Sequence, residues 1–211
     1  MADTARHMGE AGRPGVPGAV VLAAGGSTRL GRPKQLLVLG GEPLVRRAAR
    51  AALEAGLSPV VVVVGAAADG VRAAIAGLPV AAVENAGWAE GIGSSIRAGI
   101  AALARAGAPA AAVVLCDQPR LDAAHLARLA ATWRAGAAIA ASAYGGARGV
   151  PAVFDASVFG ELASLAGDRG ARAVISRDPA RVAEVPFPGG EEDVDRPEDW
   201  ERVTGPYSRR R

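Results

Sequence analysis

The most informative stretch of the chain is Val20-Val-Leu-Ala-Ala-Gly-Gly-Ser-Thr-Arg-Leu-Gly-Arg-Pro-Lys34, an apolar run followed by a glycine-rich loop. Its last residue is the only lysine among 24 basic residues, a compact point charge in a chain that otherwise uses arginine. Glycines let a backbone approach phosphate oxygens with its N–H groups. The segment matches neither GxxxxGK[ST] nor GxGxxG. We interpret it as a phosphate cradle; the alternative is a plain strand-to-helix turn with two solvated cations, Arg29 and Lys34.

Apolar runs alternate with helical patterns along most of the chain. Runs without polar alternation suit strands that are buried on both faces of a parallel sheet. The alternation of strands and helices therefore predicts an α/β fold with right-handed crossovers. Beyond Tyr144 the pattern is looser, and we expect residues 150–154 and 182–185 to be antiparallel additions. The predicted strands are residues 19–24, 59–64, 80–83, 110–116 and 137–141, and the predicted helices are residues 43–55, 67–76, 94–106 and 122–134.

An aspartate follows one of these predicted strands. In an open α/β sheet, ligands bind beyond the carboxyl ends of the strands. Asp117 stands at the end of the strand 110–116, where its carboxylate is well placed to hold Mg²⁺, a hard cation that prefers oxygen ligands and phosphate. The alternative is a helix N-cap, but Asp122 is the better candidate for that task.

Two further polar segments allow a structural and a functional interpretation. In residues 193–199, Pro197 suits the first turn of a helix, and taken alone the acidic residues favour helix capping over metal binding. In residues 85–95, Ser94 or Ser95 is a candidate helix cap, and the alternative is a polar loop that recognises a nucleobase.

Composition narrows the class of protein. Hydrophobic residues make up 50% of the chain and aromatic residues only 4%, so the core must be built from alanine, valine and leucine. Arg209, Arg210 and Arg211 account for the whole net charge of +3, and we therefore expect no nucleic-acid partner. No apolar run approaches the roughly 20 residues needed to span a membrane. The single cysteine, Cys116, is expected to be a small buried hydrophobe and fits a cytoplasmic protein.

The chain is expected to hold one domain. We predict a flexible N-terminal tail over residues 1–17, a domain over residues 18–204 and a basic C-terminal tail over residues 205–211. His125 lies in a helical pattern and is expected to be a packing or surface residue.

Taken together, the motifs resemble those of the MobA-like NTP transferases, and most closely the molybdenum cofactor cytidylyltransferase (MocA-like) branch. The opening signature of that family is L-A-A-G-x-S-x-R-x-G-x-P-K, and the chain matches it from Leu22 to Lys34. The resemblance extends over about residues 18–203. The later matches are Asn85…Trp88…Gly91-Ile-Gly-Ser-Ser-Ile96…Gly99, Cys116-Asp-Gln-Pro119, Gly149-Val-Pro-Ala-Val-Phe154, Gly167-Asp-Arg-Gly-Ala-Arg172 and Asp193-Val-Asp-Arg-Pro-Glu-Asp199.

The resemblance implies a Rossmann-like three-layer nucleotidyltransferase fold with a mostly parallel central sheet. It implies catalytic roles for Arg29, Lys34 and Asp117, and a metal site of Asp117 and Asp195 for Mg²⁺, with Mn²⁺ as the alternative ion. Asp195 thereby gains a role beyond capping, although Arg196 replaces the usual threonine beside it. The implied nucleotide-binding residues are Leu22, Ala23, Ala24, Gly25, Gly26, Arg29, Lys34, Asn85, Gly91 and Ser95.

The implied activity is transfer of CMP from CTP to the terminal phosphate of molybdopterin or the molybdenum cofactor, with release of pyrophosphate. The guanylyltransferase branch more often resembles G-P-L-A-G where this chain has Gly91–Ser95, which favours CTP. One alternative is a related transferase that uses GTP or another phosphorylated acceptor. A second is a non-catalytic carrier of the cofactor, and a molybdoenzyme client is compatible with either.

Overall fold

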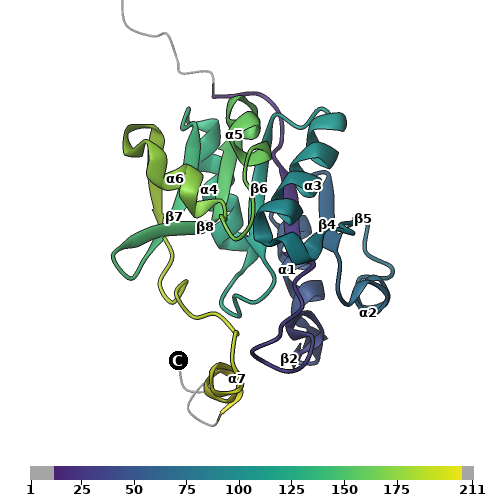
Figure 1. The fold of residues 1–211 in the computed structure, drawn as a ribbon. Helices are drawn as coiled ribbons and strands as arrows, with labels where there is room; N and C mark the ends of the chain where they lie inside the picture. The colour runs from purple at the N-terminus through teal and green to yellow at the C-terminus, as the bar shows by residue number, and fades with distance from the viewer. Residues whose placement is uncertain (1–11, 206–211) are drawn as a thin grey trace, which may run out of the picture.

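A seven-stranded sheet forms the middle layer of the protein (Figure 1). The computed structural model describes residues 12–205. The strand order is β5-β4-β1-β6-β8-β7-β9, and β8 runs antiparallel to both of its neighbours whereas the other pairs are parallel. The strands are β1 (Gly18–Ala23), β4 (Val60–Val64), β5 (Ala81–Glu84), β6 (Ala110–Leu115), β7 (Ile139–Tyr144), β8 (Ala147–Asp155) and β9 (Val182–Pro186).

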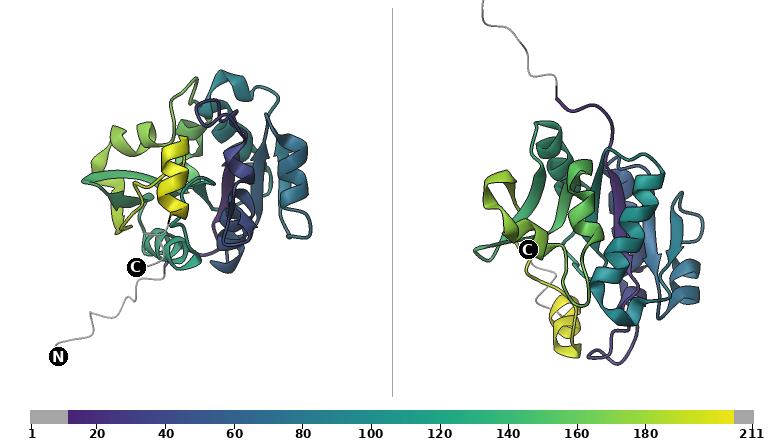
Figure 2. Two further views of the ribbon diagram at one scale, coloured as in Figure 1. Left: turned by 90° about the horizontal axis from the view of Figure 1, so that it is seen from below. Right: turned by 45° about the horizontal axis from the view of Figure 1, so that its top comes forward.

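Helices cover both faces of this sheet. On one face pack α1 (Leu44–Glu54), α2 (Ala68–Ala74) and α4 (Ala123–Arg134). On the other pack α3 (Ile92–Arg105), α5 (Phe159–Ala163) and α6 (Arg172–Arg177), which stand in front of the sheet in Figure 1. The helix α7 (Pro197–Thr204) lies outside these layers, beside the segment that follows β1 (Figure 2). That segment contains a two-stranded ribbon, β2 (Val38–Leu39) and β3 (Glu42–Pro43).

The central strands β1, β4 and β6 are apolar throughout because each has a core on both sides, whereas the edge strands β5 and β9 are largely exposed or half-buried. Within β1, Ala19, Val21 and Ala23 pack toward α1 and α4, whereas Val20 and Leu22 pack toward α3. All five valines of β4 are buried as well. This double coverage is what a continuous apolar run predicts, and it confirms the α/β, mostly parallel architecture.

The short 3-10 helices lie at the connections between these elements. They are η1 (Lys34–Leu36), η2 (Trp88–Glu90), η3 (Ala156–Val158) and η4 (Pro179–Arg181). The first two lie beside the cavity described below. No helix within residues 12–205 is long and apolar enough to cross a membrane.

The C-terminal third departs from the expectation in one respect. Residues 150–154 are antiparallel in β8, as predicted, but residues 182–185 belong to β9, which pairs in parallel with β7. The prediction for β9 was wrong because both sides of β8 are taken by β6 and β7, so that β9 pairs with β7 after the chain has passed through α5 and α6. Strand β8 ends opposite Ile139, where β7 begins, and β9 begins opposite the same residue, so the chain enters β9 in the direction of β7. Strand β9 therefore pairs with the free side of β7 and is parallel to it.

The ends of the chain lie largely outside the described residues, as do the three terminal arginines. Residues 12–17 form no helix or strand, yet Arg13 contacts the body of the domain. Its backbone N–H donates to the carbonyl of Arg134 at 2.8 Å, and its guanidinium pairs with Asp155. The division into residues 1–17, 18–204 and 205–211 stays a prediction.

Helix α3 lies directly on β1 because its residue 99 is glycine. A Cβ atom at Gly99 would overlap with Cγ1 of Val20, which is fully buried in β1. This close approach brings the first turn of α3 to the end of the strand that enters the glycine-rich loop.

We predict that Gly99→Ala lowers the free energy of unfolding by about 1–3 kcal/mol, since the added methyl group overpacks this contact. Gly160→Ala is the matched control: Gly160 also lies in a helix, but a Cβ there would meet no atom within 4 Å. The control should be neutral or stabilising by about 0.5 kcal/mol. Urea unfolding followed by circular dichroism measures both, and equal stabilities of the two variants would contradict the packing argument.

His125 is a buried packing residue, only 1% exposed. Its ring stacks on Phe187, and its Nε2 lies 2.7 Å from Oγ of Ser142, which in turn donates to the carbonyl of Pro151. The guanidinium of Arg128 donates to Nδ1 at 3.1 Å, an arrangement that requires the neutral ring. Burial lowers the pKa of His125 to about 4, Arg128 adds to this effect, and Asp122 opposes it.

The lowered pKa predicts a loss of stability in acid. The unfolded histidine takes up a proton below about pH 6.5, whereas the folded one does so only near pH 4, so stability falls as the pH drops through this window. At pH 5 the loss should be about 2 kcal/mol, and His125→Gln should remove most of this pH-dependent part. Urea unfolding of both proteins at about pH 7.5 and pH 5 tests this, and the same pH dependence in both would refute it.

Candidate functional site

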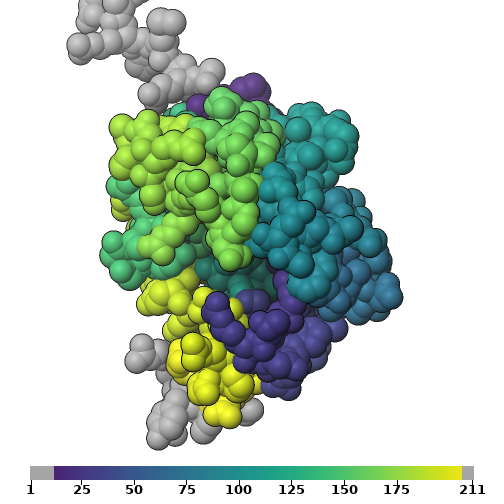
Figure 3. Space-filling model, in the orientation of Figure 1, coloured from purple at the N-terminus to yellow at the C-terminus, as the bar shows by residue number. Residues whose placement is uncertain are grey.

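A cavity of about 430 Å³ opens at the carboxyl ends of β1 and β6. On the surface, the purple segment that follows β1 and the yellow C-terminal segment meet below a hollow (Figure 3). The cavity is lined by Leu22, Ala23, Ala24, Gly25, Gly26, Ser27, Thr28, Arg29, Lys34, Gln35, Trp88, Ala89, Gly91, Ile92, Ser95, Leu115, Cys116, Asp117, Asp168 and Asp195.

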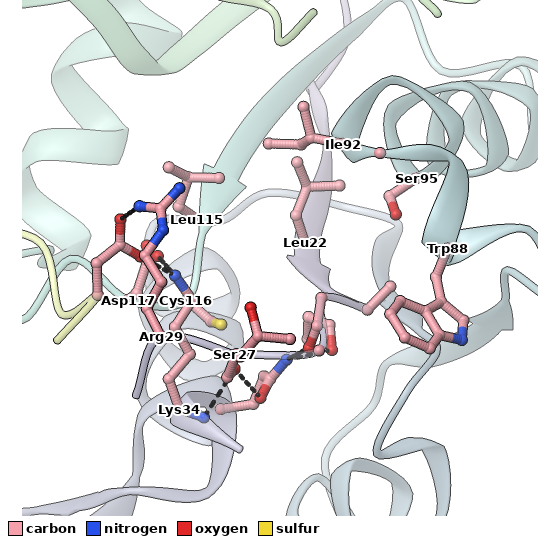
Figure 4. Close-up of a pocket in the computed structure, with 18 of the residues that line it drawn as sticks. Leu22, Ser27, Arg29, Lys34, Trp88, Ile92, Ser95, Leu115, Cys116 and Asp117 are labelled. Atoms are coloured by element: carbon pink, nitrogen blue, oxygen red, sulfur yellow. Dashed lines mark hydrogen bonds and ion pairs between the residues drawn. The ribbon is translucent and has the colours of Figure 1, made fainter. Parts of the chain in front are cut away.

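The two ends of this cavity differ in chemistry. Arg29, Lys34 and Asp117 gather on one side, whereas Trp88 and Ser95 lie on the other (Figure 4). One end therefore offers charged groups and the other an aromatic ring and a hydroxyl.

The glycine-rich loop is held from beneath by a residue that the sequence pattern did not single out. Gln35 is buried, and its Nε2 donates to the carbonyls of Ala23 at 3.1 Å and Gly25 at 2.6 Å. Ser27 has a positive φ of 51°, and its Oγ accepts a hydrogen bond from the backbone N–H of Lys34 at 3.1 Å. These bonds fix the loop backbone and the start of η1, while the side chain of Lys34 extends into the cavity.

Lys34 lies between two carboxylates. Its Nζ is 2.5 Å from Oδ2 of Asp117 and 2.6 Å from Oδ1 of Asp195, and Nη1 of Arg29 lies 3.4 Å from Oδ2 of Asp195. Lys34 and Asp117 are largely buried, with side chains 19% and 9% exposed. Burial lowers the pKa of Lys34, but Asp117 and then Asp195 raise it by more, so its pKa lies above the ordinary value and the ammonium stays charged.

Asp195 reaches this position through the packing of its neighbour. Val194 is fully buried in a small cluster with Leu30, Leu37 and Leu44, and its N–H donates to the carbonyl of Asp117 at 3.1 Å. The backbone around α7 is closed by Asp199, whose carboxylate accepts from the N–H groups of Asp195 and Arg196. Arg196 is the N-cap residue of α7, so the helix begins where Pro197 predicted.

The two aspartates fit a divalent cation that a bound ligand also coordinates better than a cation held by protein groups alone. Oδ1 of Asp117 is buried without a hydrogen-bond partner, an arrangement that is costly unless a ligand satisfies it. Within residues 12–205, no group of three or more His, Cys, Asp or Glu side chains has the geometry of a metal site. One or two carboxylates completed by substrate phosphates is the usual arrangement for Mg²⁺.

The segment 85–95 is held by Asn85. Nδ2 of Asn85 donates to Oγ of Ser94 at 2.8 Å and to Oγ of Ser95 at 3.0 Å, and its Oδ1 accepts from the N–H of Gly87. Asn85 itself does not line the cavity, and its hydrogen bonds position the residues that do; its contact with a nucleotide stays a prediction. Ser95 does line it.

The predicted serine caps are not formed. The helix α3 begins at Ile92 after Gly91, and the hydroxyl of Ser94 turns back to the carbonyl of Gly91 at 2.8 Å instead of accepting from a backbone N–H. Gly91 has a φ of 110° and packs directly against Gly167, where a side chain would overlap. By contrast, Asp122 caps α4 as predicted, accepting from the N–H of His125 at 2.7 Å.

Apart from Asn85, every predicted site residue lines the cavity. Sequence reasoning missed Gln35, Ser27, Trp88 and Asp168 as members of the site. Trp88 and Asp168 lie within motifs that the family resemblance rests on, and that position was the available signal. Gln35 carried none, because its role depends on two carbonyls that only the folded loop turns toward it. Cys116 lies beside Asp117 but is buried, and burial raises the pKa of its thiol, so it is the small hydrophobe that we expected.

A sheet between two layers of helices, with a cavity at the carboxyl ends of its parallel strands, is the arrangement of a nucleotide-binding α/β protein. A model of the MobA-like NTP transferase domain matches residues 19–182, and the chain belongs to this family.

Individual relatives carry different activities in their names. The nicotine blue oxidoreductase of Paenarthrobacter nicotinovorans is 40% identical over 181 residues, which are 82% of this chain and 87% of that protein. A probable molybdenum cofactor guanylyltransferase of Opitutus terrae is 38% identical over 120 residues, 55% of each chain. The Rv0371c structure from Mycobacterium tuberculosis, in complex with manganese, has a TM-score of 0.72 at 34% identity and covers 90% of this chain and 98% of its own. Family membership therefore does not fix the substrate.

We predict that Gln35→Met, which keeps the volume but removes the amide, leaves the two carbonyls without a donor. The free energy of unfolding should fall by about 1–3 kcal/mol, and the loop should bind triphosphate less tightly. Urea unfolding and calorimetric titration with a nucleoside triphosphate measure the two effects. Unchanged stability would show that the buried amide does not hold the loop.

Proposed function

We propose that this protein transfers CMP from CTP to the terminal phosphate of a molybdopterin-type acceptor and releases pyrophosphate. The observation that carries the proposal is the placement of Lys34 and Arg29 beside Asp117 and Asp195, in the cavity that the glycine-rich loop also lines. This is a set of charges suited to a triphosphate and a divalent cation together.

The charged end of the cavity would take the phosphates. Gly25 and Gly26 would offer backbone N–H groups, and Lys34 and Arg29 would neutralise the charge that develops on the departing pyrophosphate. Asp117 and Asp195 would hold Mg²⁺ or Mn²⁺, and the structure of the related Rv0371c is a complex with manganese. When bound, the ion would supply charge neutralisation and orientation of the phosphates.

The other end of the cavity would take the base. Oγ of Ser95 accepts from Asn85, and among the described residues it has no acceptor for its own proton. The adjacent O2 and N3 atoms of cytosine are acceptors, so this hydroxyl suits the edge of a pyrimidine. Trp88 lies on the same side and offers an aromatic surface (Figure 4). The competing nucleotide is GTP, which the name of the Opitutus relative favours.

The acceptor would approach Asp117 from the side on which β6 faces β8. The strand β6 pairs with β1 as far as Leu115 but with β8 only as far as Val113, so the edge next to Asp117 has no strand partner on that side. Gln118 bridges this gap by donating from Nε2 to the carbonyls of Val150 and Gly190, and its Oε1 is buried without a partner.

The reaction needs no strong base in this arrangement. A terminal phosphate oxygen of the acceptor, already anionic, attacks the α-phosphorus of CTP. The bond from that phosphorus to the bridging oxygen breaks, and pyrophosphate leaves in line. The site contributes positioning and charge stabilisation.

The single, buried Cys116 also agrees with the reducing environment of a cytoplasmic protein.

The test is to incubate the protein with Mg²⁺, labelled CTP or GTP and the molybdenum-loaded cofactor, and to follow pyrophosphate release and transfer of label. We expect turnover with CTP. Pyrophosphate release with GTP but not with CTP would make the protein a guanylyltransferase. Binding of the cofactor without consumption of either nucleotide would make it a carrier.

We predict that Asp117→Asn and Lys34→Ala each lower turnover by roughly tenfold or more. The matched control is Asp193→Asn, which removes the same charge two residues from Asp195 on a side chain that does not line the cavity. Its turnover should stay within about threefold of the wild-type value. Near wild-type rates for Asp117→Asn would exclude the assigned role.

A further inference from the structure

Lys34 occupies the place that the proposed metal ion needs. One oxygen of Asp117 and one of Asp195 converge on the same Nζ atom, at 2.5 and 2.6 Å. A divalent ion held by both of these carboxylates would need the space that the ammonium group fills. The ion and the ammonium cannot both stand between these oxygens.

The ion pairs around Lys34 are balanced in charge among themselves, and Asp168, which also lines the cavity, adds a negative charge outside them. Lys34 and Arg29 carry two positive charges, and Asp117 and Asp195 carry two negative ones. A divalent ion that entered without a nucleotide would displace the ammonium from the two carboxylates. The ammonium would then lie in a partly buried cavity without a new negative partner. An unpaired charge in such a place of low dielectric is unfavourable. A triphosphate brings such a negative partner with it.

The local structure allows the ammonium to move while its backbone stays fixed. The N–H of Lys34 donates to Ser27 and its carbonyl accepts from the N–H of Leu37, so the main chain is held at both ends. The side chain lines the cavity and has a flexible four-carbon stem. A nearby phosphate can therefore take the ammonium from the carboxylates without any rearrangement of the loop.

We propose that Lys34 is an exchangeable internal cation that keeps the metal site filled until a nucleotide arrives. This proposal rests on the proposed function, which assigns the metal to Asp117 and Asp195. It makes the site selective for the metal–nucleotide complex over the free metal ion. The phosphates take over Lys34, and the vacated carboxylates then receive the ion.

The experiment measures Mn²⁺ affinity from the electron paramagnetic resonance signal of the free ion. Wild-type protein, Lys34→Met and Arg29→Met are titrated without nucleotide and with the α,β-methylene analogues of CTP and GTP, which cannot react. We expect weak Mn²⁺ binding to the wild type without nucleotide. In the presence of an analogue that the protein binds, whether of CTP or of GTP, Mn²⁺ binding should be at least about tenfold tighter. Without nucleotide, Lys34→Met should bind Mn²⁺ at least about tenfold more tightly than the wild type.

Arg29→Met is the matched control. It removes one positive charge from the same cluster, but the side chain of Arg29 is 70% exposed and lies 3.4 Å from only one of the carboxylates. Its nucleotide-free affinity should change by less than about threefold, because an exposed pair contributes little. A gain as large as that of Lys34→Met would reduce the effect to general electrostatics and overturn the proposal.

Two further variants separate the possible failures. Lys34→Gln guards against a folding defect in Lys34→Met, with circular dichroism as the check, and the same gain is expected in both. Asp117→Asn should lose Mn²⁺ binding in the presence of nucleotide. If Asp117→Asn loses binding but neither Lys34 variant gains nucleotide-free affinity, the exchange is wrong and the metal assignment stands. If Asp117→Asn binds Mn²⁺ like the wild type, the metal assignment fails and the exchange fails with it.

Discussion

The ammonium of Lys34 between the carboxylates of Asp117 and Asp195 is the interaction on which the site depends. Two carboxylates this close, one of them nearly buried, repel each other unless a cation lies between them. The three residues come from three separate parts of the chain. The loop after β1 supplies the lysine, the end of β6 supplies one aspartate, and the segment before α7 supplies the other.

Several features of the fold serve to hold these parts in register. The parallel pairing of β1 with β6 places the ends of two strands, distant in sequence, side by side. Gln35 fixes the loop from below by binding two of its carbonyls. The buried Val194 fastens the C-terminal segment to Asp117 through a backbone hydrogen bond, and its contacts with Leu30 and Leu37 join that segment to the loop. The position of Asp195 is therefore a consequence of hydrophobic packing around its neighbour.

The other end of the cavity is made by other parts of the chain than the charged end. It is formed by the segment 85–95, together with Asp168 from a loop that packs on Gly91. None of these residues takes part in the charged cluster, so they can change without disturbing it. This separation is consistent with relatives whose names describe an oxidoreductase and a guanylyltransferase.

The sequence by itself determined the α/β architecture, because uninterrupted apolar runs such as that of β4 are stable only when both faces of a sheet are covered. It also determined the places of the glycine-rich loop and of Asp117, since each directly follows an apolar strand. Tertiary structure alone decided the direction of β9 relative to its neighbour, which depends on its pairing with β7 and not with β8. It alone decided that Asn85 holds the loop rather than lining the cavity, that Gln35 supports the loop, and that Asp195 meets Lys34. These outcomes depend on contacts between residues far apart in sequence, and periodicity and local turn chemistry carry no information about such contacts.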